Sequence, residues 1–104
     1  MLQSDIESLL DERAKLHPND PKIENYWDKI SSLLGKDLSS TITVFYSLSE
    51  NHILLLSEVF DDIAIALQSY DFICALRELE NKFPNIDISS SISIAESCIP
   101  PDQG

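Results

Sequence analysis

Three carboxylates within five residues form the densest group of potentially functional side chains in this sequence. Glu58, Asp61 and Asp62 belong to the run SEVFDDI, and at helical spacing they share one stripe of a helix. Such a stripe is typical of a solvated helix face. It could also hold a divalent cation together with Glu50 or Asp71, or bind a positively charged partner.

The distribution of charge favours the positively charged partner. The formal net charge is -11, from 18 acidic and 7 basic residues, and Arg77 is the only lysine or arginine between Glu50 and Glu80. Like charges gathered in this way repel one another, and a basic partner relieves that repulsion. The same charge repels nucleic-acid phosphates and anionic membranes, so we expect neither as a direct partner. A tyrosine beside acidic residues is typical of a protein-binding anchor, which adds Tyr70 to the candidates. The predicted partner-binding residues are Glu50, Glu58, Asp61, Asp62, Tyr70, Asp71 and Glu78.

The other residues that support chemistry are few. His17 precedes a proline and His52 begins a predicted helix, so both are expected at the surface. The sequence has no His-x-x-x-His, Cys-x-x-Cys or calcium-loop pattern, and its two glycines leave no phosphate-binding loop. We therefore predict no catalytic residues, no metal site, no cofactor and no enzymatic activity.

Cysteine usage and hydropathy indicate a cytoplasmic protein. Cys74, on the apolar side of a helical pattern, and Cys98 are expected to be reduced and mostly buried. No apolar run approaches the roughly 18–20 residues that span a bilayer, and the N-terminal residues lack the pattern of a signal peptide.

A long apolar segment, residues 53–68, must hold these groups in place, and Ser49-Glu50-Asn51 is expected to cap the helix that it forms. It is apolar around most of its circumference except for the acidic stripe, so other helices must surround it. Helices are predicted around it from capping signals and apolar spacing, at about 4–16 with a Ser4–Glu7 capping box, 21–34 between Asp20 and Gly35, and 70–83.

Two segments fit both helical and strand periodicity. In residues 37–48, Ile42, Val44 and Tyr46 alternate as in a strand, and in 86–99 isoleucines alternate with polar residues. In both segments, apolar residues also recur at helical spacing. We predict helices over 37–48 and from about 89, because a lone strand would lack a partner unless the two segments paired with each other. The expected fold is therefore one all-α domain, residues 1–104, in which about five to six helices form a compact antiparallel bundle around 53–68 and residues 100–104 form a disordered tail.

The C-terminal half resembles a known family. The SEVFDDI run, the pair Gln68-Ser69, the segments DFI at 71–73 and KFP at 82–84, and Leu76 and Leu79 are similar to small helical immunity proteins of bacterial contact-dependent growth inhibition. The resemblance implies a helical fold, no enzymatic activity and one-to-one binding of a cognate toxin domain, often an RNase. The three acids of SEVFDDI have no evident packing role, which supports a role in binding.

The charge pattern and the resemblance give the same hypothesis. An RNase gathers phosphates in a basic cleft, and an acidic face that covers this cleft would inhibit it. Three alternatives are an adaptor or nucleic-acid mimic that occupies a nucleic-acid-binding protein, an assembly subunit that pairs through the edge at 86–99, and an enzyme that uses His52 or Asp61.

Overall fold

The computed structural model describes residues 2–17 and 19–99, and these residues form seven α-helices and one 3₁₀ helix, with no strand among them. The elements are α1 (Leu2–Ala14), α2 (Ile23–Leu34), α3 (Leu38–Ser47), α4 (Glu50–Leu56), η1 (Ser57–Val59), α5 (Phe60–Leu67), α6 (Tyr70–Lys82) and α7 (Ser89–Ser97). The predicted all-α class is confirmed. The two ambiguous segments are helical, as α3 and α7. The predicted tail, residues 100–104, lies outside the described residues.

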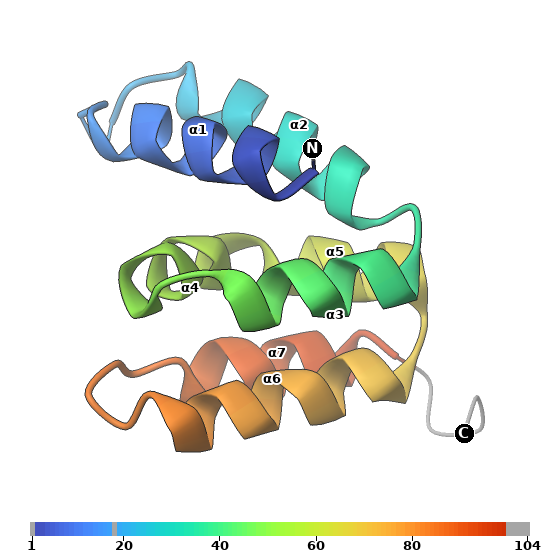
Figure 1. The fold of residues 1–104 in the computed structure, drawn as a ribbon. Coiled ribbons are helices and arrows are strands. Elements are labelled where there is room, and N and C mark those ends of the chain that lie inside the picture. Colours follow the sequence, from blue (N-terminus) through green and yellow to red (C-terminus); the bar gives the residue numbers. More distant parts are fainter. Residues whose placement is uncertain (1, 18, 100–104) are drawn as a thin grey trace.

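The helices are stacked in three layers (Figure 1). The first layer contains α1 and α2, the second contains α3, α4, η1 and α5, and the third contains α6 and α7. Within each layer the chain passes from the near side of the molecule to the far side, so α1, α3 and α6 lie in front of α2, α5 and α7. Contacts between layers follow this order, since α3 packs on α6 and α5 packs on both α2 and α7. The second layer is therefore covered on both sides, which is why its sequence is the most apolar.

The predicted helix over 53–68 occupies this middle layer but is not continuous. It is divided into α4 and α5 by the single 3₁₀ turn of η1, where Val59 has φ -124° and ψ 15°. The Ser57 hydroxyl donates a hydrogen bond to the carbonyl of Leu54 at 2.5 Å, a contact that often bends helices. Apolar periodicity gave no sign of the break because Leu56 and Phe60, the residues on its two sides, are both buried.

The core is one cluster that draws side chains from all three layers. Its centre is aromatic: the ring of Phe45 on α3 lies 6.0 Å from that of Phe60 on α5, and 5.4 Å from that of Phe72 on α6 in an edge-on arrangement. Thr41 is the buried polar residue of the core, and its hydroxyl donates to the carbonyl of Leu34. The isoleucines around 86–99 also enter this core, because Ile88, Ile92 and Ile99 are buried.

Helix capping was predicted correctly at some positions and wrongly at others. Ser49 caps α4 by accepting a hydrogen bond from the backbone N–H of His52. The Ser4–Glu7 capping box is wrong, because α1 already begins at Leu2. The second helix starts two residues later than predicted, although the Asp20 carboxylate does accept a hydrogen bond from Lys22 N–H at 2.9 Å.

Gly35 ends α2 as predicted, with its N–H bonded to the carbonyl of Ser31, and it also sets the distance between two layers. A Cβ atom at this position would lie 2.6 Å from the Cβ of Ala66 on α5 and 2.9 Å from the Ser31 carbonyl oxygen. Its φ of -88° is ordinary, so space rather than backbone conformation demands a glycine here. The C-terminal end of α2 is thereby held close to α5.

Candidate functional site

The three carboxylates of SEVFDDI lie at the break between α4 and α5. Glu58 is in η1, and Asp61 and Asp62 are in the first turn of α5, where the helix dipole favours negative charge. Asp61 Oδ1 accepts a hydrogen bond from the N–H of Asp62 at 2.9 Å. The Asp61 carboxylate therefore makes a local hydrogen bond that the sequence did not reveal.

Glu58 is bound to the first layer. Arg13 Nη2, on α1, donates to both Glu58 carboxylate oxygens, at 3.0 and 3.2 Å. The Arg13 guanidinium also lies 5.2 Å from the ring centre of Trp27, and only 13% of the Arg13 side chain is exposed. The expectation that all three acids lack a structural role is therefore wrong for Glu58, whose charge is compensated within the protein.

Asp28, on α2, was not among the predicted site residues but belongs to the site. The pKa of Asp62 is raised above its ordinary value by the partial removal of its carboxylate from water and then by the negative charges of Asp61 and Asp28. Among residues 2–17 and 19–99, no lysine or arginine lies within ion-pair distance of these three carboxylates. We call Asp28, Asp61 and Asp62 the acidic cluster. Only the packing of α2 on α5 brings Asp28 to it, so no local sequence signal could have found it.

Beside the acidic cluster, a hollow of about 180 Å³ lies between α7 and the start of α5. Its lining residues are Ser57, Glu58, Asp61, Ser91 and Ile94. The hollow therefore joins acidic side chains of the second layer to an exposed isoleucine of the third.

The remaining predicted residues are dispersed over the molecule. Tyr70 is half-buried, and its hydroxyl donates to the Ile99 carbonyl at 3.1 Å, which ties the start of α6 to the residues after α7. Glu78 accepts a hydrogen bond from the Tyr46 hydroxyl of α3, which raises the pKa of that tyrosine. Glu78 therefore belongs to the α3–α6 side, opposite α5 and α7 in Figure 1.

Two further predicted residues lie at helix starts. Glu50 is in the first turn of α4 and Asp71 is in the first turn of α6, positions where the helix dipole stabilises a carboxylate. The structure thus groups Glu58, Asp61 and Asp62 and does not bring Glu50, Tyr70, Asp71 and Glu78 to them.

The remaining ion pairs of the described residues lie away from the acidic cluster. His52 Nε2 lies 2.8 Å from Asp11 Oδ1, and Arg77 contacts Glu80 at 3.5 Å and Glu96 at 3.2 Å. In the described part of the chain, no three histidine, cysteine or acidic side chains are arranged to hold a metal ion.

The cysteines differ from expectation in their burial. Both are free, as predicted, but Cys74 is exposed on α6 and Cys98 is half-buried. The prediction that Cys74 faces the core was wrong because its neighbours Ile73 and Ala75 face the core instead.

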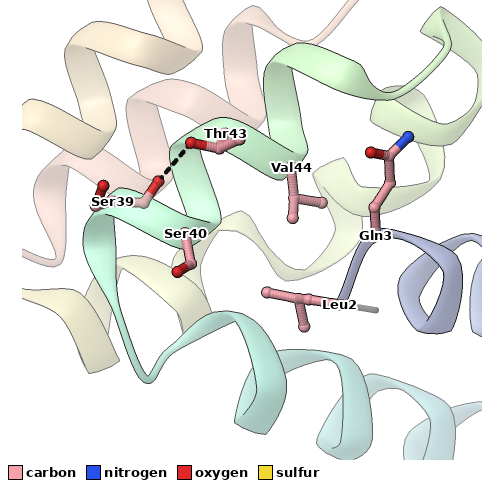
Figure 2. Close-up of a pocket in the computed structure, with 6 residues that line it drawn as sticks. All are labelled: Leu2, Gln3, Ser39, Ser40, Thr43 and Val44. Atoms are coloured by element: carbon pink, nitrogen blue, oxygen red, sulfur yellow. Dashed lines mark hydrogen bonds between the residues drawn. The ribbon is translucent and has the colours of Figure 1, made fainter.

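A larger hollow, of about 280 Å³, lies between α1 and α3 (Figure 2). It is lined by Leu2, Gln3, Ser39, Ser40, Thr43 and Val44. The Thr43 hydroxyl donates to the Ser39 carbonyl at 3.0 Å, so it is already occupied by the backbone of its own helix. The lining side chains carry no charge and no nucleophile–base pair, so the acidic cluster is the stronger candidate.

Comparisons with protein-family models, curated proteins and solved structures found no match to this chain. Within the described residues, no helix is long and apolar enough to cross a bilayer.

Proposed function

We propose that this protein is a cytoplasmic immunity protein that binds a basic bacterial toxin domain, an RNase, in a one-to-one complex. The acidic cluster would cover the substrate cleft of the toxin. One observation carries the proposal: Asp28, Asp61 and Asp62 come from two layers of the fold, the negative charges of Asp61 and Asp28 act on Asp62, and all three lack a basic partner among the described residues. The resemblance of the C-terminal half to immunity proteins supports it.

The electrostatics of Asp62 show what such a partner would gain. The raised pKa of Asp62 means that ionising its carboxyl group costs more in the free protein than it does in water. A lysine or arginine placed against the cluster would remove that penalty and add its own attraction. An RNase supplies such groups, because its cleft must attract phosphates. We therefore expect fast association that slows steeply as salt is raised.

The direct test is growth rescue. The chain is co-expressed with the toxin domain encoded immediately upstream of its gene, where the resemblance places a cognate toxin. The native chain should restore growth, and an Asp28→Asn/Asp61→Asn/Asp62→Asn variant should lose this protection together with its affinity for the purified toxin domain. Glu58 is left intact, because its removal would leave the buried Arg13 without a partner.

The matched control removes three exposed acids elsewhere, in an Asp5→Asn/Glu12→Gln/Asp87→Asn variant. The acidic-cluster variant and the control both lose three negative charges. A difference in protection between them therefore comes from the site and not from net charge. Protection by the control alone would support the cluster as the interface. Equal protection by both would move the interface elsewhere, and no protection by the native chain would contradict the immunity function and favour the adaptor or nucleic-acid mimic.

The structure gives less support to the alternative that this protein is an assembly subunit that pairs through residues 86–99. That segment forms α7 rather than a free strand edge, and its isoleucines at 88, 92 and 99 are buried in the protein's own core.

A further inference from the structure

The most exposed large apolar side chains of the described residues lie next to the acidic cluster. Ile65 on α5 and Ile94 on α7 are 54% and 55% exposed, more than Leu54 and Tyr46. Isolated exposed apolar residues are common on protein surfaces, so their mutual position decides whether they form a surface.

Ile65 and Ile94 lie on the same side of the molecule. Asp61 near the start of α5 shares a hollow with Ile94, and at the other end of α5 the Gln68 side-chain amide donates to the Cys98 carbonyl at 3.5 Å. The two helices therefore run side by side in the same direction, as Figure 1 also shows. Ile65 is one turn from Asp61 on the same stripe of α5, so it lies on the side of α5 that carries Asp61.

We call the surface along these two helices the α5–α7 seam: Asp61, Ser91 and Ile94 line the hollow, and Ile65 follows Asp61 one turn along α5. The seam combines two exposed isoleucines with the Asp61 carboxylate, which has no basic partner among the described residues. Protein interfaces commonly have this composition, in which an apolar centre supplies affinity and charged residues at the rim select the partner.

We infer that the α5–α7 seam is the apolar centre of the partner interface, and that the partner places an aliphatic or aromatic side chain there, flanked by lysine or arginine. This inference rests on the proposed function and adds to it the chemistry of the facing surface. A second copy of this chain fits less well. A twofold interface would bring the same carboxylates of both copies together, and each copy has a net charge of -11.

The test compares two variants in binding to the purified toxin domain, measured by calorimetry. Ile65→Ser/Ile94→Ser should weaken binding at least about tenfold, because two half-exposed isoleucines no longer become buried. This loss should be the same at low and high salt, whereas the loss caused by the acidic-cluster variant should shrink as salt screens it. Tyr46→Ser, which removes an exposed side chain from the α3–α6 side, should leave affinity unchanged.

A second probe separates this inference from the proposed function. It is a lysine-rich peptide with leucines along one helical face, beside a peptide in which serines replace the leucines. The native chain should bind the leucine peptide more tightly, with amide shifts concentrated on α5 and α7, and the isoleucine variant should lose this preference. If the isoleucine variant still prefers the leucine peptide, or if it binds the toxin domain as tightly as the native chain does, the inference is wrong. If the toxin domain does not bind but the peptide behaves as expected, the immunity function is wrong and the seam serves another basic partner.

Discussion

Two groups of carboxylates lie next to each other in this protein and have opposite consequences for its stability. Glu58 is fixed by Arg13, and Asp11 by His52, so each of these contacts joins the first layer to the second. Asp28 and Asp62 also belong to these two layers, yet their interaction is repulsive. The same residue type therefore holds two layers together at one position and pushes them apart at another.

The presence or absence of a basic partner inside the protein distinguishes structural acids from binding acids better than their exposed fraction does. Glu58 is 41% exposed, yet its partner Arg13 is largely buried and stacked near Trp27. A group that costs stability and has no partner inside the protein is the better candidate for a partner outside it, because natural proteins accept such costs mainly at functional sites.

The largest expected effect comes from breaking the compensated pair. Arg13→Ala should lower the free energy of unfolding by about 2 kcal/mol, because it removes the ion pair to Glu58 and the contact with Trp27. Denaturant unfolding measures this change. Arg13→Met keeps most of the side-chain volume and should recover part of the loss, which divides it between packing and charge.

Lys15→Ala, at an exposed position just after α1, serves as the control and should change stability by less than about 0.5 kcal/mol. Binding of a basic partner should persist in folded Arg13→Ala protein. A loss of binding as large as that of the acidic-cluster variant would mean that the two groups of acids are not functionally distinct.

Much of this arrangement follows from the sequence. The apolar segment 53–68 predicts a covered middle layer, and Ser49 and Gly35 mark two helix ends correctly. The helical assignment of 37–48 depended on a tertiary argument, the lack of a partner strand, and it is confirmed.

What the sequence could not supply was the pairing of distant side chains. Arg13 and Glu58 are 45 positions apart, and nothing near either of them signals the contact. The same holds for Asp28, which reaches Asp62 only through the packing of α2 on α5. Local patterns predicted which acidic residues are exposed. The fold determined which of them have a basic partner within the protein.

The next largest expected effect comes from changing the distance between α2 and α5, which keeps Asp28 near Asp62. Gly35→Ala should destabilise the protein by about 1–2 kcal/mol, because the new methyl group would meet Ala66 and the Ser31 carbonyl and force α2 away from α5. Thermal or denaturant unfolding measures the loss. The double variant Gly35→Ala/Ala66→Gly removes one of these contacts, so the two substitutions should be coupled and cost less than their sum. Strict additivity would show that the Gly35–Ala66 contact does not set the spacing.

The smallest effect is the most specific to the acidic cluster. Asp62→Asn should leave stability unchanged or raise it by up to about 0.5 kcal/mol, since Asp62 is largely solvated and its repulsion is screened. Because folding raises the Asp62 pKa above 3.8, the folded protein holds this proton more tightly than the unfolded chain does. The native protein and the Asp62→Asn variant should therefore be equally stable below pH 3.8. The variant should become the more stable one as the pH rises from 3.8 to the raised pKa.

Ionisation of Asp62 lowers stability but should strengthen the binding of a basic partner. A basic partner prefers ionised Asp62, so the affinity of the native chain should increase over the pH range in which the stability advantage of the variant appears. Unfolding and binding isotherms over a pH series, with Asp87→Asn as the control, measure both trends. An Asp62→Asn variant that is less stable at neutral pH would place Asp62 with Glu58 among the structural acids. The site would then reduce to Asp28 and Asp61, whose carboxylates would have to attract the partner alone.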